Sequence, residues 1–115
     1  MQKIYHKLVR DRIPEIISAN GSTSEIEIMD EETYRQALRQ KLIEEAQEAA
    51  TADEQHLIAE LADLYEVIDA LMTCYHISPT QVRDEQTQRR TTRGGFSQRI
   101  RLLSTSSVEH DNQEE

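Results

Sequence analysis

The sequence predicts an all-α protein, a helical bundle built around two long antiparallel helices. Aromatic residues make up only 4% of the chain and Trp is missing, a composition that suits helices of Leu, Ile and Ala better than an aromatic-rich sandwich or barrel. Apolar residues recur at helical spacing in two long segments. A chain of 115 residues has room for one domain with a modest core, so we expect oligomerisation to complete the bundle, as a homodimer or homotetramer.

The N-terminal part should hold one short helix. Residues 13–19 suit a helix because Pro14 falls in the first turn, and the Asn-Gly pair at 20–21 can end it with a left-handed residue. Residues 25–28 (EIEI) alternate with period two, which predicts a short strand or an extended linker but is no basis for a sheet.

Two long helices should follow. Asp30 can cap the first, over residues 31–51, whose first turn opens with two glutamates that favour a helix N-terminus. The second spans about residues 55–76 and carries Leu and Ile at helical spacing, so it should be strongly amphipathic.

The remainder of the chain is more polar. A third helix should run from about residue 79 to 91, since the Ser-Pro pair at 78–79 suits a cap and a first turn. Residues 93–96 (RGGF) then form a loop or turn. We expect the domain to cover residues 1–103 and the polar tail, 104–115, to be disordered.

Charge and cysteine content limit the possible partners. The net charge of −9 argues against a general nucleic-acid binder, whose affinity would depend on Lys and Arg at phosphates. The single cysteine, Cys74, excludes an internal disulfide, and no apolar run approaches the ~20 residues of a membrane span or resembles a signal peptide. These features predict a cytoplasmic protein with no membrane or nucleic-acid partner.

Acidic residues are concentrated in one stretch. From Glu44 to Asp69 the chain has nine acids and no Lys or Arg, whereas six of its 13 Lys and Arg lie between Arg83 and Arg101. Something must neutralise these acids, although solvent and salt can also screen a spread-out acidic face.

The direction of each acid follows from the turn of about 100° per residue in a helix. On the first long helix, Glu45 lies inside the apolar arc, Glu48 at its edge and Glu44 further round toward solvent. On the second, Glu60 lies inside the apolar arc and Asp63 just past its edge. Four of these acids therefore face the surface where the helices should pack: Glu45, Glu48, Glu60 and Asp63.

Burying unpaired carboxylates costs several kcal/mol each, so these acids need a compensating partner. Each helix carries two of them three residues apart and so side by side, and clustered carboxylate oxygens suit Mg²⁺ or Mn²⁺. Alternatively, Glu45 and Glu60 extend to the rim of the packed surface or pair with basic residues. Lys41, one turn from Glu45, is a candidate for such a pair.

Residues 44–48 (EEAQE) and 60–63 (ELAD) resemble the EExxE and ExxD signature of the all-α nucleoside triphosphate pyrophosphohydrolases, the MazG-like superfamily. Residues 5–14 (YHKLVRDRIP) and 93–96 (RGGF) are similar to the phosphoribosyl-ATP pyrophosphohydrolase-like branch, a predicted house-cleaning branch. The similarity extends over residues 3–103.

The resemblance implies an oligomeric bundle that hydrolyses a nucleoside triphosphate to the monophosphate and pyrophosphate, with Mg²⁺, or Mn²⁺, as cofactor. Carried over to the matching positions, Glu45, Glu48, Glu60 and Asp63 are metal ligands. Glu44 and Glu45 are the catalytic candidates, and Glu44 would orient or deprotonate the attacking water.

Basic residues are the candidates for holding the triphosphate, because the chain has no Gly-rich loop of the Walker type. We expect Lys7, Arg10 and Arg93 to bind phosphate; otherwise each is a surface charge or an ion-pair partner. Two alternative functions stay open. One is a non-catalytic helical module that oligomerises or binds a partner, and the other is a phosphoribosyl-ATP pyrophosphohydrolase with the same chemistry.

Overall fold

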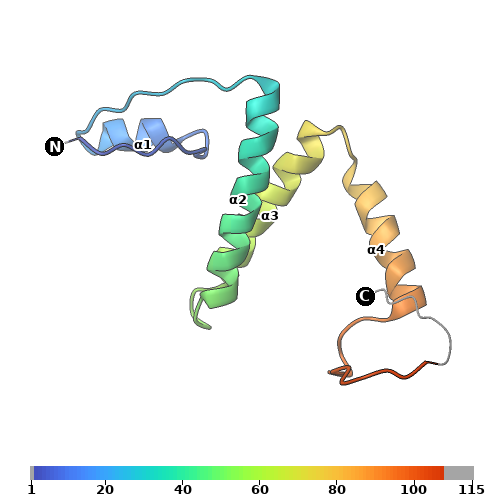
Figure 1. Cartoon of the computed structure of the whole chain (residues 1–115). Helices are drawn as coiled ribbons and strands as arrows, with labels where there is room; N and C mark the ends of the chain where they lie inside the picture. The colour runs from blue at the N-terminus through green and yellow to red at the C-terminus, as the bar shows by residue number, and fades with distance from the viewer. Residues whose placement is uncertain (1, 108–115) are drawn as a thin grey trace. The chain divides into compact units, whose positions relative to one another are not determined.

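The computed structural model describes residues 2–107. Within that range the chain is all-helical and has no strand, which confirms the all-α prediction (Figure 1). The chain divides into two units, Met1–Val82 and Arg83–Glu115. Of the tail expected to be disordered, residues 104–107 have no helix or strand, and 108–115 lie outside the described residues. The helices are α1 (Ile13–Ala19), α2 (Glu31–Thr51), α3 (Leu57–Cys74) and α4 (Pro79–Arg93).

Side-chain caps mark the starts of α2 and α4. α1 and α2 have the expected bounds, and the Asp30 carboxylate accepts a hydrogen bond from the Thr33 N–H at 2.8 Å at the start of α2. α4 ends at Arg93, two residues later than expected, so Arg93 is helical and not part of the predicted loop. α4 opens with a reciprocal cap. The Ser78 N–H donates to the Gln81 side chain, and the Gln81 N–H donates to the Ser78 hydroxyl, at 2.8 and 3.1 Å. Such caps satisfy backbone N–H groups that the first helical turn leaves without partners.

α3 is two residues shorter at its start than expected. The Asp53 carboxylate accepts a hydrogen bond from the His56 N–H at 3.0 Å and lies 2.8 Å from the His56 ring nitrogen. These contacts hold residues 53–56 in a turn. The helix therefore begins at Leu57.

α3 also ends two residues early, because His76 takes the left-handed conformation with φ 59°. The His76 N–H bonds to the Thr73 carbonyl and the Ile77 N–H to the Met72 carbonyl, the Schellman pattern that closes many helices. Residues 25–28 form neither helix nor strand, so the extended-linker alternative is the correct one there.

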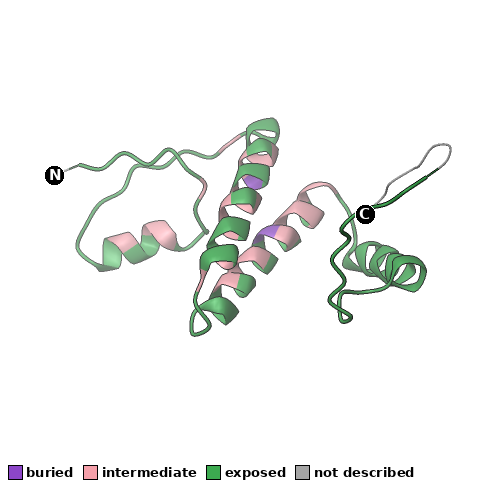
Figure 2. Ribbon diagram, turned by 60° about the horizontal axis from the view of Figure 1, so that its bottom comes forward, coloured by how far each residue is buried: buried purple, intermediate pink, exposed green. Residues whose placement is uncertain are grey.

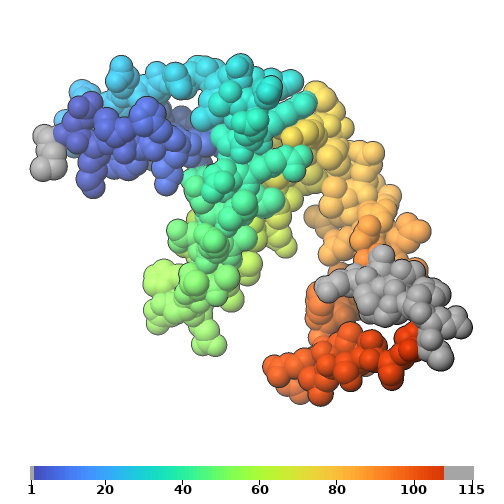
Figure 3. All heavy atoms as spheres, in the orientation of Figure 1, coloured from blue at the N-terminus to red at the C-terminus, as the bar shows by residue number. Residues whose placement is uncertain are grey.

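The buried part of the first unit lies where α2 packs against α3, to which it is joined by residues 52–56 (Figures 1 and 3). Leu38 on α2 and Val67 on α3, 3% and 7% exposed, are the buried hydrophobic residues in the described range (Figure 2). Every described residue from 76 onward is exposed. The chain by itself therefore has a very small core.

None of the helices within residues 2–107 has both the length and the apolar composition needed to cross a membrane.

Candidate functional site

Three of the four predicted metal ligands come together between α2 and α3. One oxygen each from Glu45, Glu60 and Asp63 lies within 4.8 Å of the other two. The Glu45 side chain is only 16% exposed, although a carboxylate is costly to remove from water. We call these three residues the acidic cluster. Packing of α2 on α3 brings these like charges together, as the helical rotation of the sequence predicts.

Glu48, the fourth predicted ligand, is exposed and is not part of the acidic cluster. It still lies near enough for its charge to act on Glu60. Glu44, the predicted water-orienting residue, is half-buried, and its carboxylate lies 3.9 Å from the Lys41 amine. The motif 44–48 thus contributes one oxygen to the acidic cluster and keeps two further carboxylates beside it.

Glu60 carries the clearest electrostatic signature of the site. Partial burial raises the pKa of its carboxyl group, and the nearby charges of Glu48, Asp63 and Glu45 raise it further, against a smaller opposing effect of His56. In the described part of the chain, no Lys or Arg forms an ion pair with Glu60. The site therefore holds more negative charge than its own cations balance, and an added cation would be favourable here.

The other two acids of the cluster have basic partners. Arg10, from the segment that precedes α1, places its guanidinium 2.6 Å from an Asp63 oxygen. Lys41 lies 3.8 Å from Glu45 and 3.9 Å from Glu44, so a single amine is shared between two carboxylates. The sequence made Lys41 a candidate partner of Glu45, as the alternative to a metal ion, but gave no signal for the Arg10–Asp63 pair, whose members are 53 residues apart.

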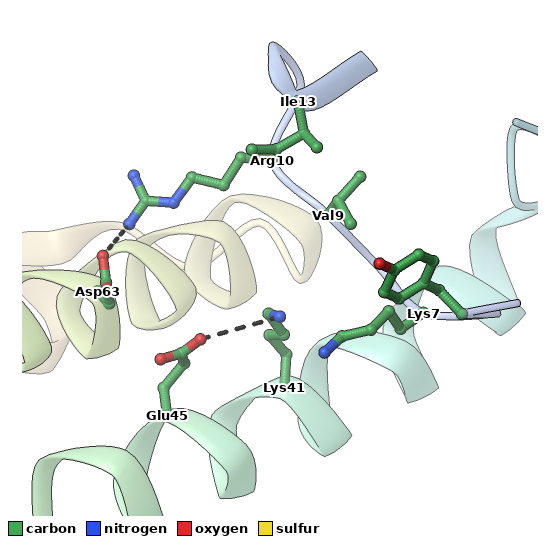
Figure 4. Close-up of a pocket in the computed structure, with 8 residues that line it drawn as sticks. Lys7, Val9, Arg10, Ile13, Lys41, Glu45 and Asp63 are labelled. Atoms are coloured by element: carbon green, nitrogen blue, oxygen red, sulfur yellow. Dashed lines mark hydrogen bonds and ion pairs between the residues drawn. The ribbon is translucent and has the colours of Figure 1, made fainter. Parts of the chain in front are cut away.

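A pocket of about 290 Å³ opens beside the acidic cluster. Figure 4 shows Arg10 reaching from the N-terminal segment to Asp63 on α3, with Lys41 and Glu45 one turn apart on α2. The pocket combines three basic side chains with two carboxylates, and apolar groups from the N-terminal segment form the rest of its wall. Its lining residues are Tyr5, Lys7, Val9, Arg10, Ile13, Lys41, Glu45 and Asp63.

The three basic residues expected to bind phosphate have different positions. Lys7 and Arg10 line the pocket. Arg93 is the last residue of α4 and belongs to the second unit, so its assignment to phosphate stays a prediction. Lys41 lines the pocket as well, a role that the sequence did not suggest. The sequence did hold a signal that Lys41 lies close to the acids, because it precedes Glu44 and Glu45 by three and four residues on the same helix.

The donor set of the acidic cluster fits a hard divalent cation, which prefers carboxylate oxygens. Two oxygens on one Mg²⁺ lie about 2.9 to 4.2 Å apart, given a Mg–O distance of about 2.1 Å. Oxygens that lie within 4.8 Å of one another reach this spacing through small side-chain rotations. Arg10 already holds one oxygen of Asp63, so it would compete with an ion for that atom.

A short stretch of the chain is similar to a known protein. Over 47 residues, which make up 41% of this chain, it is 49% identical to an uncharacterized protein of Mycolicibacterium smegmatis. The chain thus spans about half of that relative, 48% of its length. No protein-family model matches the chain, and no solved structure matches it.

Proposed function

We propose that this chain is a Mg²⁺-dependent nucleoside triphosphate pyrophosphohydrolase of the MazG-like type, with the acidic cluster as its metal centre. The observation that carries the proposal is the convergence of Glu45, Glu60 and Asp63 beside a pocket with three basic side chains. Acids alone would suit a free cation, and bases alone a free anion. Both together suit a polyphosphate that arrives with its metal ion.

The basic side chains of the pocket have a clear task in this proposal. Lys7, Arg10 and Lys41 would neutralise the oxygens of the triphosphate, as phosphoryl-transfer enzymes do by positioning and charge stabilisation. A bound Mg²⁺ would polarise the phosphorus that is attacked and lower the pKa of water. Arg10 would exchange its carboxylate partner, Asp63, for phosphate when substrate enters.

The acids outside the cluster complete the assignment. Glu48 is one turn from Glu45 on α2 and would add a fourth carboxylate, directly or through water. Glu44 would orient the attacking water or accept its proton, with Lys41 fixing its position. The substrate class that we favour is a non-canonical nucleoside triphosphate, as in house-cleaning. Phosphoribosyl-ATP is the alternative substrate for the same site.

Pyrophosphate release from a panel of canonical, modified and phosphoribosylated triphosphates, with and without Mg²⁺ or Mn²⁺, tests this function. We expect release that stops when the metal is chelated. The substrate that gives the highest kcat/KM then separates house-cleaning from the phosphoribosyl-ATP alternative. Purified protein that releases no pyrophosphate from any member of the panel would rule the function out.

Self-association is the second part of the proposal. With Leu38 and Val67 as the buried hydrophobic residues in the range 2–107, one copy buries too little apolar surface for a stable bundle. We therefore infer that α2 and α3 form an antiparallel pair that further copies complete, as a homodimer or homotetramer. This part also holds for a non-catalytic helical module, so it does not depend on hydrolysis.

A further inference from the structure

The second unit contains a segment that is both basic and apolar. Residues 86–107 include five arginines and no acid. Within them, residues 96–103, which we call the arm, expose all four of their large hydrophobic side chains, among them Phe96 at 97%. Soluble chains seldom leave so many large apolar groups together in water without a partner. The exposed residues are Phe96, Ile100, Leu102 and Leu103.

The backbone of the arm suits it to lie along a surface. The Arg99 N–H bonds to the Phe96 carbonyl at 3.0 Å, which closes a turn, and the described residues after it have no helix or strand. In an extended segment successive side chains point to opposite sides. Arg99 has a left-handed φ of 58°, so this alternation can begin only after it. Ile100 and Leu102 would then share one side, and Arg101 and Leu103 the other.

α3 offers a surface of matching character in the first unit. Ile58, Leu61 and Tyr65 are exposed, Tyr65 at 69%, and their spacing of three and four residues places them on one face. Val67 is the buried residue of α3, and α3 packs against α2. Val67 follows Ile58 by nine residues and so lies about 180° round the helix from it. This apolar face of α3 is therefore turned away from α2.

Two parts of a second copy could cover this face, its own α3 face or its arm, and their charges differ. The stretch from Glu44 to Asp69 has nine acids and no Lys or Arg, so two α3 faces packed on each other would bring acids together. The arm brings arginines and no acid. Ile100 and Leu102 would cover the face, while the arginines of the arm would meet the surrounding carboxylates.

We propose that the arm of one copy docks on the apolar face of α3 in a second copy, and that the exchange is reciprocal. A reciprocal exchange satisfies both arms and both faces in a closed dimer. The inference rests on the proposed self-association and is independent of the proposed hydrolysis.

Sedimentation equilibrium of the full chain and of an arm variant, Ile100→Asp with Leu102→Asp, tests the role of the arm. We expect a roughly tenfold or greater rise in the dimer dissociation constant, since burial of one Leu or Ile accounts for about a factor of ten or more. Thr105→Asp adds a charge just beyond the arm and should leave the constant unchanged. Circular dichroism should show the same helix content in all three proteins.

Disulfide trapping shows which segment lies on the apolar face of α3. In a Cys74→Ser background, a tagged chain with Tyr65→Cys is mixed with an untagged chain with Leu102→Cys. We expect a disulfide between the two chains, and none when Ala59→Cys, exposed on another side of α3, replaces Tyr65→Cys. A monomeric chain would overturn both the self-association and the docking. An arm variant that dimerises with an unchanged dissociation constant, or Tyr65→Cys chains that link only to each other, would overturn the docking alone. So would a disulfide that forms only within the chain when Tyr65→Cys and Leu102→Cys are placed in the same chain.

Discussion

The α2–α3 pair is net acidic and residues 83–107 are net basic, and the two regions also differ in how their side chains are buried. In the first region, helix packing buries Leu38 and Val67 and forces the three carboxylates of the acidic cluster together. In the second, every described residue is exposed, and large apolar side chains lie beside arginines in residues 96–103. The comparison suggests that each region needs something from outside. In our proposals, the first region binds a cation between its clustered carboxylates, and the second places its exposed apolar side chains on the surface of another copy.

The largest effect should come from removing one charge of the acidic cluster. Glu45→Gln or Glu60→Gln keeps the shape of the side chain but replaces the negatively charged carboxylate by a neutral amide. Mg²⁺-dependent pyrophosphate release should therefore fall at least on the order of a hundredfold. Glu66→Gln changes an exposed acid on the same helix as Glu60 and should have little effect. Full activity in both cluster variants, with helix content unchanged, would show that the cluster is not the metal centre.

The two regions should also differ in what an apolar side chain contributes to stability. Leu38→Ala removes a buried side chain and should lower the free energy of unfolding by about 2 to 3 kcal/mol. Leu103→Ala makes the same chemical change at an exposed site and should cost under about 0.5 kcal/mol in dilute protein. Urea unfolding followed by circular dichroism measures both. Equal losses would mean that the α2–α3 contact is not the core.

Local signals were enough to predict most of the fold. The bounds of α1 and the start of α2 follow from Pro14, the Asn-Gly pair at 20–21 and the Asp30 cap, all of which act within a few residues. The two ends of α3 were predicted two residues too far out, because the local features that set them are harder to recognise in a sequence. His56 joins Asp53 in a turn, and His76 adopts a left-handed φ that is usually left to glycine.

Of the candidate site, only the features that depend on the direction of each side chain around its helix could be predicted. Rotation placed Glu45 and Glu60 toward the neighbouring helix, and both join the acidic cluster. Glu48 lies at the edge of the apolar arc, where exposure depends on how the two helices cross, and it remains exposed. The contact of Arg10 with Asp63 depends on how the N-terminal segment lies against α3, which no spacing in the sequence specifies.

Arg10 should compete with a metal ion for Asp63 and assist the nucleotide. Because the pair is half-exposed, it is worth at most about 1 kcal/mol. Arg10→Gln should therefore tighten Mn²⁺ binding roughly two- to fivefold without nucleotide, while raising KM for the triphosphate. Calorimetry measures the first quantity and steady-state kinetics the second. Arg12→Gln, which removes a local pair with Glu15, is the matched control, and weaker Mn²⁺ binding in Arg10→Gln would contradict the competition.

The smallest effect should be a pH-dependent one at the start of α2. The Thr33 N–H lowers the pKa of Asp30 by hydrogen bonding to its carboxylate. A folded-state pKa below the unfolded value means that the carboxylate stabilises the helix above the unfolded pKa, and that this stabilisation is lost as pH falls through the folded pKa. Thermal unfolding should thus show Asp30→Ala to be less stable than the parent chain at neutral pH, with the difference shrinking toward about pH 3. Asp30→Asn keeps a helix cap whose side chain does not titrate, so the stability of this variant should vary less with pH in that range. If the parent chain loses no more stability than Asp30→Asn as the pH falls, the ionised carboxylate is not what caps the helix.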